Sequence, residues 1–223
     1  MDSPSFDMLR WMDAEASEDF ARLVARCTHP AGQAIYTQQE FGTQMYRVTR
    51  GLVRLMTRAD DGREVVFLLF GEGDCFGVSS LVDGGPRPQT AECLIETELE
   101  ILELEGFEDL LRRHASFARA VMMVLTLQMR VVSQYFVSSH LTSLASRVAM
   151  RIIENARIRP HESVTGQLVF SLTQSELAAL VGASRQAVNK VLQALHRDGA
   201  LTLSHRAIIV KDLQELRRHV EAV

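Results

Sequence analysis

The spacing of apolar residues changes near Phe107, and this change constrains the fold more than any other feature of the chain. Before it, short segments alternate apolar and polar residues between Gly and Asp turns, which is typical of antiparallel strands. The predicted strands are Gln33–Tyr36, Met45–Thr57, Glu64–Phe70, Thr90–Glu96 and Glu98–Leu104. One helix is predicted before them, over Ser17–Cys27. Many short strands with little intervening helix predict an antiparallel barrel or sandwich and exclude a βαβ sheet.

After Phe107 the apolar spacing becomes helical, and residues 115–141 contain no Gly or Pro. Six positions in this stretch recur at alternating spacings of three and four: Met122, Leu125, Met129, Val132, Phe136 and Ser139. A seam of about two and a half heptads favours pairing with a second helix. Packing of the helix on its own domain is the alternative, because a firm coiled-coil assignment needs about three to four heptads.

Charge is distributed unevenly along the chain. Residues 1–140 hold 13 Arg and no Lys against 21 Asp and Glu, a net charge of −8, whereas residues 141–223 hold 11 Lys and Arg against 7 acids, a net charge of +4. Positive charge is the sequence-independent part of nucleic-acid affinity, so this asymmetry is typical of a sensor joined to a polyanion-binding module. Two domains of unequal isoelectric point would also produce it.

No apolar run approaches the ~20 residues that a membrane span needs. The first residues, Met1 to Pro4, are acidic rather than basic, which does not resemble a secretory signal. Three unclustered cysteines indicate a reducing compartment. We therefore expect a cytoplasmic protein that does not associate with a membrane.

Residues 170–195 have the pattern of a helix-turn-helix. Thr173 and Glu176 form a capping box for a first helix, Gly182 provides the turn, and Ser184 caps a second helix. The apolar spacing of the second helix turns four side chains inward: Val188, Val191, Leu192 and Leu195. The opposite face then presents four polar side chains: Arg185, Gln186, Asn189 and Lys190.

These four residues are suited to reading base edges in the major groove. Arg pairs with guanine in bidentate fashion, Gln and Asn match adenine, and Lys reaches guanine or phosphate. Thr173, Gln174 and Ser184 stand at helix starts, where hydroxyls and free backbone N–H groups favour phosphate oxygens. Residues 201–203 and 207–210 predict a two-stranded wing, and Arg206 at its tip is a further candidate for phosphate.

Two other classes of protein are weighed against a DNA reader. An enzyme is disfavoured, because the sequence shows no nucleophile elbow, P-loop or His-Glu-x-x-His motif. A ligand-binding module that no longer reads DNA is the second alternative. The outward Arg185 and Lys190 argue against it.

The segment Gly182–Lys190 is similar to the recognition-helix motif of the CRP/FNR family of transcription regulators, and the chain resembles that family over nearly its whole length. The resemblance implies an α+β fold with three parts. These are a cyclic-nucleotide-binding-like sensor with a jelly-roll antiparallel β-barrel (1–114), a dimerisation helix (115–141) and a C-terminal winged helix-turn-helix (142–223).

The resemblance also implies how the protein acts. It implies a homodimer that reads an inverted repeat in double-stranded promoter DNA, with RNA polymerase as a further candidate partner. Arg185 takes the place of the guanine-reading arginine of the family. Gln186 stands where the best-known member carries Glu, and Lys190 replaces a second arginine, so we expect a related rather than an identical operator.

In the family, the phosphate of a cyclic nucleotide is held by a loop of the form Gly-Glu-x(n)-Arg-Ser/Thr. The resemblance makes five residues candidates for an effector pocket here: Gly77, Ser79, Ser80, Arg87 and Thr90. Val78 stands at the place of the ribose-binding Glu, and Pro88 at that of the Ser/Thr after the arginine. Losing both groups weakens nucleotide binding by roughly two to four decades, so control by cyclic AMP is not expected.

Three states of the barrel remain open. It binds another small anionic effector through Arg87 and the Ser79-Ser80 loop, it responds weakly to a cyclic nucleotide, or it is competent without an effector. No metal or redox cofactor is expected, since Cys27, Cys75 and Cys93 lie far apart and the histidines lack metal-ligand spacing.

Overall fold

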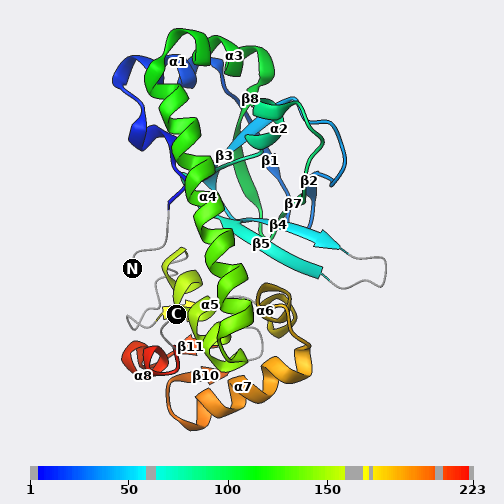
Figure 1. Cartoon of the computed structure of the whole chain (residues 1–223), viewed down its shortest axis with the longest axis vertical. Helices are drawn as coiled ribbons and strands as arrows, with labels where there is room; N and C mark the ends of the chain where they lie inside the picture. The colour runs from blue at the N-terminus through cyan, green and yellow to red at the C-terminus, as the bar shows by residue number, and fades with distance from the viewer. Residues whose placement is uncertain (1–4, 59–63, 159–167, 171–172, 204–207, 221–223) are drawn as a thin grey trace. The chain divides into compact units, whose positions relative to one another are not determined.

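A computed structural model describes residues 5–58, 64–158, 168–170, 173–203 and 208–220 (Figure 1). Contacts divide the chain into two compact units. The first comprises residues 4–59 and 66–132, and the second comprises residues 133–223 with the short segments 1–3 and 60–65. The division falls inside the long helix α4 (Ala115–Leu141).

Two four-stranded sheets form most of the first unit (Figure 1). In order across the sheet, one contains β1 (Ala25–His29), β8 (Thr97–Glu103), β3 (Gln44–Arg50) and β6 (Cys75–Phe76). The other contains β2 (Ala34–Tyr36), β7 (Thr90–Cys93), β4 (Val53–Arg58) and β5 (Glu64–Phe70). The pairings β1–β8, β3–β8, β3–β6, β2–β7 and β4–β7 are antiparallel. This confirms the antiparallel architecture predicted from the period-two pattern.

An aromatic cluster fills the space between the two sheets. Tyr36 from one sheet and Tyr46 from the other pack with ring centroids 5.8 Å apart. Phe76 stacks on Tyr46 at 5.1 Å, and Phe70 lies 5.3 Å from Phe76. Met45, Tyr46 and Val48 of β3 and Leu99 and Leu102 of β8 are also buried, so the core of this unit lies along these two strands.

Most predicted elements differ from the structure by a few residues at their ends, and two of them differ more. The predicted strand Met45–Thr57 is two strands, β3 and β4, because the chain turns at Gly51 (φ +112), where a Cβ would lie 2.5 Å from the Thr97 hydroxyl. The predicted helix Ser17–Cys27 is α1 (Ala14–Leu23), which begins after Asp13 because the Asp13 carboxylate accepts a hydrogen bond from Ala16 N at 2.9 Å. The residues that follow form β1 instead.

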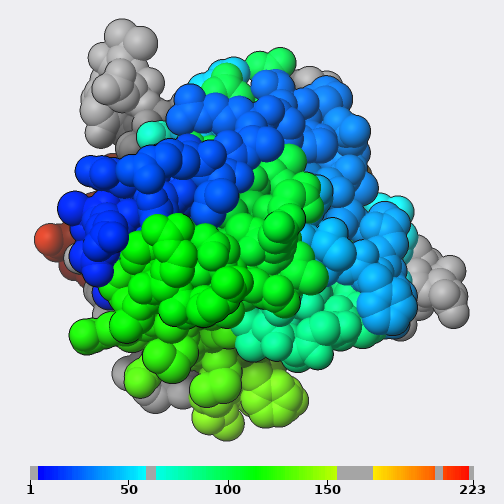
Figure 2. Space-filling model, turned by 90° about the horizontal axis from the view of Figure 1, so that it is seen from above, coloured from blue at the N-terminus to red at the C-terminus, as the bar shows by residue number. Residues whose placement is uncertain are grey.

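Short helices complete the first unit. The 3-10 helix η1 (Met8–Trp11) precedes α1, α2 (Ser79–Asp83) follows β6, and α3 (Leu104–Arg113) follows β8. Viewed from the end, the N-terminal segment lies beside the green residues of α3 and α4 (Figure 2).

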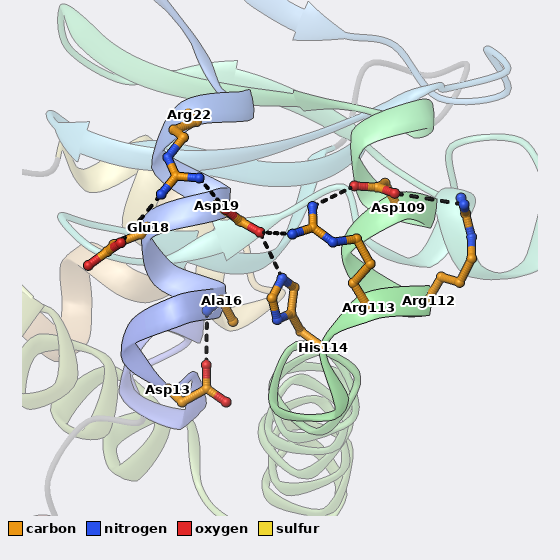
Figure 3. A network of polar contacts seen from close by, with 9 residues as sticks. All are labelled: Asp13, Ala16, Glu18, Asp19, Arg22, Asp109, Arg112, Arg113 and His114. Carbon is orange, nitrogen blue, oxygen red and sulfur yellow. Dashed lines mark hydrogen bonds and ion pairs between the residues drawn. The ribbon is translucent and has the colours of Figure 1, made fainter.

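A buried carboxylate holds α1 to the junction of α3 and α4 (Figure 3). His114 Nε2 donates to Asp19 Oδ2 at 3.0 Å, and Arg22 Nη1 donates to Asp19 Oδ1 at 2.7 Å. Arg113 also donates to Asp19. These hydrogen bonds keep the pKa of Asp19 below its ordinary value, with the bond from His114 as the largest cause.

Helix α4 presents apolar side chains on two faces. Phe117, Val124 and Val131 are buried in the first unit, where Gln128 Nε2 also donates to Cys75 O of β6 at 3.1 Å. A second set is exposed: Met122 (60%), Met129 (66%), Val132 (38%) and Phe136 (66%). Of the predicted seam, only Leu125 is half-buried. Helix α4 is also long and apolar enough to cross a membrane, a property that the core helix of a soluble protein shares.

The second unit is a helical domain with a small sheet. Its elements are α5 (Leu144–Ile158), β9 (Leu168–Phe170), α6 (Gln174–Val181), α7 (Arg185–Arg197), β10 (Leu201–Leu203), β11 (Ile208–Val210) and α8 (Leu213–Arg218). The strand order is β10-β11-β9, and all pairings are antiparallel among the described strands. Val148, Ile152, Leu177, Leu192 and Leu216 supply the core. The hairpin of β10 and β11 confirms the strands of the predicted wing, whereas β9 was not predicted.

Candidate nucleic-acid interface

The first helix of the predicted helix-turn-helix starts at a complete capping box. Glu176 N donates to Thr173 Oγ1 at 3.2 Å, and Thr173 N donates to Glu176 Oε2 at 2.6 Å. Helix α6 ends at Gly182, which adopts φ +63 and therefore favours glycine. These features confirm the predicted start and end of α6.

Three residues, 182–184, separate α6 from the second helix, α7. Ser184 Oγ accepts a hydrogen bond from Ala187 N at 3.2 Å and caps the helix, as predicted. Val188, Leu192 and Leu195 are buried, and Val191 is half-buried. The inward face thus fixes which side chains of α7 point to solvent.

Three of the four predicted base readers are exposed on the first turns of α7. Arg185 and Gln186 occupy the first two helical positions, and Lys190 lies one turn further on. Asn189 differs, because it is half-buried and its Oδ1 atom is enclosed with no hydrogen-bond partner among the described residues. Its carboxamide is less accessible than the other three groups.

The predicted phosphate contacts gather at the two helix starts. Thr173 and Ser184 are exposed N-cap residues, and Gln174 is half-buried at the first position of α6. Both hydroxyls already accept a backbone N–H, so a phosphate would meet their O–H protons and the remaining free N–H groups. Arg206, the fourth predicted contact, lies outside the described residues.

A group of residues that the sequence did not single out joins the C-terminal end of α4 to α5. Tyr135 Oη donates to Glu154 Oε2 at 3.2 Å, and Arg151 Nη1 donates to the same oxygen at 3.2 Å. The Arg151 guanidinium lies over the Tyr135 ring, and burial lowers the pKa of Arg151 to about 10. Arg151 therefore stays charged at neutral pH, and helical spacing alone gave no signal for this contact.

The connection between α4 and α5 is also closed by hydrogen bonds. Thr142 Oγ1 donates to Ser138 O at 2.8 Å, and both residues are buried. Arg147 Nη1 donates to Thr142 O at 3.0 Å, which pairs a carbonyl at the end of α4 with a positive charge.

The five candidate effector residues are only partly brought together. Arg87 Nη1 donates to Gly77 O at 2.7 Å, so these two meet. Thr90 Oγ1 instead accepts from Gln38 N at 3.0 Å. Ser80 is buried, with no partner for its Oγ among the described residues, and Ser79 is half-buried. Val78, at the place of the family's ribose-binding Glu, is buried and offers no hydrogen bond.

Arg87 itself is enclosed, with 2% of its surface exposed. Besides its bond to Gly77 O, it donates from Nη2 to Gln44 O at 2.6 Å, and its guanidinium carbon lies 4.3 Å from the centre of the Tyr36 ring. A cyclic nucleotide does not fit this arrangement, because the guanidinium that would meet its phosphate is enclosed by the chain itself.

The cysteines and histidines suggest no further site. Cys75 and Cys93 are buried and Cys27 is half-buried, all as free thiols. Burial raises the pKa of the Cys75 thiol to about 12, so it stays protonated at neutral pH. Within the described ranges, no three His, Cys, Asp or Glu side chains gather as metal ligands.

Comparison with known proteins covers most of the chain. Residues 26–114 match the model of the cyclic nucleotide-binding domain, and residues 146–219 match that of the Crp-like helix-turn-helix domain. A cyclic AMP receptor protein of Thermus thermophilus is 32% identical over 187 residues, which is 84% of each chain. A CRP-like cAMP-activated global transcriptional regulator of Mycobacterium tuberculosis is 28% identical over 190 residues, 85% of each chain.

A solved structure agrees with both matches. It is that of a CRP/FNR-family transcriptional regulator from Thermus thermophilus, which superposes with a TM-score of 0.79 at 26% identity and covers 89% of this chain and 99% of the other. These relatives are transcription regulators rather than enzymes. The chain therefore belongs to the CRP/FNR family and is a transcription regulator with a helix-turn-helix DNA-binding domain.

Proposed function

We propose that the protein is a homodimer that binds an inverted repeat in double-stranded DNA through helix α7 of each protomer. The observation that carries this proposal is the division of α7 into two faces. Val188, Leu192 and Leu195 are buried, while Arg185 and Lys190 are exposed on its N-terminal half. The first turns of a recognition helix are the part that enters the major groove.

Individual roles follow from side-chain chemistry. Arg185 reads guanine, Gln186 and Asn189 read adenine, and Lys190 contacts guanine or phosphate. Thr173, Gln174 and Ser184 position the domain on phosphates, and Arg206 adds a charge from the wing. Because Asn189 is half-buried, its contact requires the side chain to turn outward, so it contributes less than Arg185.

The exposed apolar face of α4 supports the homodimer. Met122, Met129 and Phe136 are each at least 60% exposed and recur at spacings of seven residues. Such a stripe is stabilised when a second copy of the helix covers it. Two copies place their recognition helices about one turn of DNA apart, ~34 Å.

The proposed division of labour follows the three parts expected from the sequence. Residues 1–114 form the sensor-like domain, 115–141 the dimerisation helix, and 142–223 the DNA-binding domain. A cytoplasmic location accords with a DNA-binding regulator, and RNA polymerase stays a predicted partner.

A cyclic-nucleotide-responsive regulator is the second candidate. In its favour, the Mycobacterium tuberculosis relative is named as cAMP-activated, and residues 26–114 match a cyclic nucleotide-binding domain. The enclosure of the Arg87 side chain, which is 2% exposed, argues against it. We therefore do not assign control by cyclic AMP to this chain.

Selection of binding sites from random duplexes by the full-length protein tests the proposal. The expected product is an inverted repeat whose half-sites are centred about one helical turn, ~34 Å, apart. Binding to it should weaken steeply with salt, because each neutralised phosphate releases counterions. A selection that returns no inverted repeat would contradict the proposal. So would the absence of a salt-dependent mobility shift, and either result would favour a module that no longer reads DNA.

A further inference from the structure

Arg87 is a buried cation without a carboxylate partner among the contacts that the structure describes. Its side chain makes two charged hydrogen bonds, both to backbone carbonyls: Nη1 to Gly77 O at 2.7 Å and Nη2 to Gln44 O at 2.6 Å. Its guanidinium also lies over the rings of Tyr36 (4.3 Å) and Tyr46 (5.9 Å). Enclosure of a charge is tolerated only where hydrogen bonds and favourable fields replace water, and these contacts supply both.

The backbone of Arg87 is bound as closely as its side chain. Arg87 N donates to Glu40 O at 2.7 Å, and Gln39 N donates to Arg87 O at 2.9 Å. One residue thus connects the segment between β2 and β3, the turn at Gly77 before α2, and the chain that follows α2. These are the segments that would have to separate for a ligand to enter between them.

Two glycines make room for the guanidinium. A Cβ at Gly42 would lie 1.9 Å from Nε and 2.1 Å from Cζ of Arg87, and a Cβ at Gly77 would lie 3.0 Å from Nη1. The guanidinium is therefore enclosed between the α-carbon of Gly42 and the Tyr36 ring. Its Nε, which has no hydrogen-bond partner in the described structure, is buried on the side of Gly42.

We infer that Arg87 is a structural tie, by which we mean a residue whose hydrogen bonds hold the three segments named above together. We also infer that DNA binding by this regulator does not require a cyclic nucleotide. This inference rests on the proposed function and extends it to regulation. A nucleotide phosphate could reach the guanidinium only if the segments around it moved apart, because Arg87 is 2% exposed and its terminal nitrogens hold two backbone carbonyls. Opening this enclosure costs free energy and therefore weakens nucleotide binding.

Titration of the unmodified, full-length protein tests the inference without a mutation. Cyclic AMP and cyclic GMP are each added to ~1 mM, with binding followed by calorimetry and affinity for the selected operator by fluorescence anisotropy. The expected result is no saturable heat and a change in operator affinity below about threefold. Saturable binding in this range, or a larger change in operator affinity, would overturn the inference.

A double-mutant cycle tests the tie itself. Arg87→Ala should lower the melting temperature by roughly 5–15 °C, because it removes charged hydrogen bonds and packing from a buried site. Gly42→Ala should also destabilise the wild-type protein by displacing the guanidinium. In the Arg87→Ala background the same methyl group enters the vacated space, so its effect should fall below about 2 °C.

Additive losses in that cycle would show that Gly42 and Arg87 act separately, and would overturn the tie. Arg112→Ala is the matched control, because the Arg112 side chain is 72% exposed and its ion pair with Asp109 is a surface pair, so the melting temperature should stay nearly unchanged. If Arg87→Ala does not fold, the nucleotide titration still decides the regulatory claim. Failure to select an inverted repeat would count against the proposed function alone, since calorimetry does not depend on DNA.

Discussion

His114 Nε2 lies 3.0 Å from Asp19 Oδ2, and both side chains are buried where α1 meets the junction of α3 and α4 (Figure 3). The carboxylate also accepts hydrogen bonds from Arg22 and Arg113. Protonation of Asp19, or its replacement by an uncharged amide, removes the negative charge that these three donors share. Acid should therefore weaken the attachment of α1.

We expect Asp19→Asn to lower the melting temperature at pH 7 by several degrees, with a smaller loss near pH 3. The hydrogen bond from His114 lowers the pKa of Asp19 in the folded protein, so the carboxylate stabilises the fold above its unfolded-state pKa. This contribution is lost as the pH falls through the folded-state pKa, which lies below the ordinary value for an aspartate. Thermal denaturation of both proteins across this range measures the difference.

The matched control is Glu18→Gln. Glu18 is exposed and pairs with Arg22 at 3.4 Å, so its substitution should leave the melting temperature nearly unchanged. An equal loss for Asp19→Asn at pH 7 and pH 3 would show that packing, not the charge, holds α1 in place.

Arg185→Ala should cost about 1–3 kcal/mol in operator affinity and relax the preference at one base pair of each half-site. Arg197→Ala removes an exposed arginine from the last turn of the same helix and should leave the base preference intact. Anisotropy titrations with the operator and its single-base variants measure both effects. A uniform loss across all duplexes for Arg185→Ala would assign that side chain to phosphate instead.

Gln174→Ala should weaken binding to all sequences alike, because a group at the start of α6 is placed for phosphate rather than for a base. The ratio of operator to non-specific affinity is the informative quantity, and it should stay within about twofold of the wild-type ratio. A selective loss at the operator would move Gln174 into the group of base readers.

Phe136→Glu should raise the dimer dissociation constant by at least ~100-fold, because a carboxylate would have to be buried in the apolar seam of α4. Gln134→Glu adds the same charge to an exposed position of α4 outside the seam and should leave the dimer intact. Sedimentation equilibrium of the two variants distinguishes them. Equal dimerisation of both would place the interface elsewhere.

The parts of the fold that local chemistry encodes were predictable from the sequence. The capping box of Thr173 and Glu176 and the turn at Gly182 act within a few residues, so they could be recognised directly. The antiparallel strands followed from alternation because their buried faces pack on a common core.

Features that depend on partners far along the chain were not predictable. Strand β1 was not predictable, and the predicted helix overlaps its first three residues. None of its side chains is fully buried, and its pairing with β8 joins residues 68 to 76 positions apart. The inward orientation of the Arg87 side chain depends on its hydrogen bond to Gln44 O, 43 residues away. It also depends on the space left by glycine at position 42. The sequence indicated that Arg87 is important, but it could not show whether the side chain faces a ligand or the protein interior.

The two apolar faces of α4 use different side chains, with Phe117, Val124 and Val131 turned inward and Met122, Met129 and Phe136 turned outward. In the proposed dimer, self-association and folding of the protomer are therefore separable properties, although one helix would serve both. Substitutions of these exposed residues would change the affinity between two copies, or the choice of a related regulator as partner. The packing inside each protomer would stay unchanged.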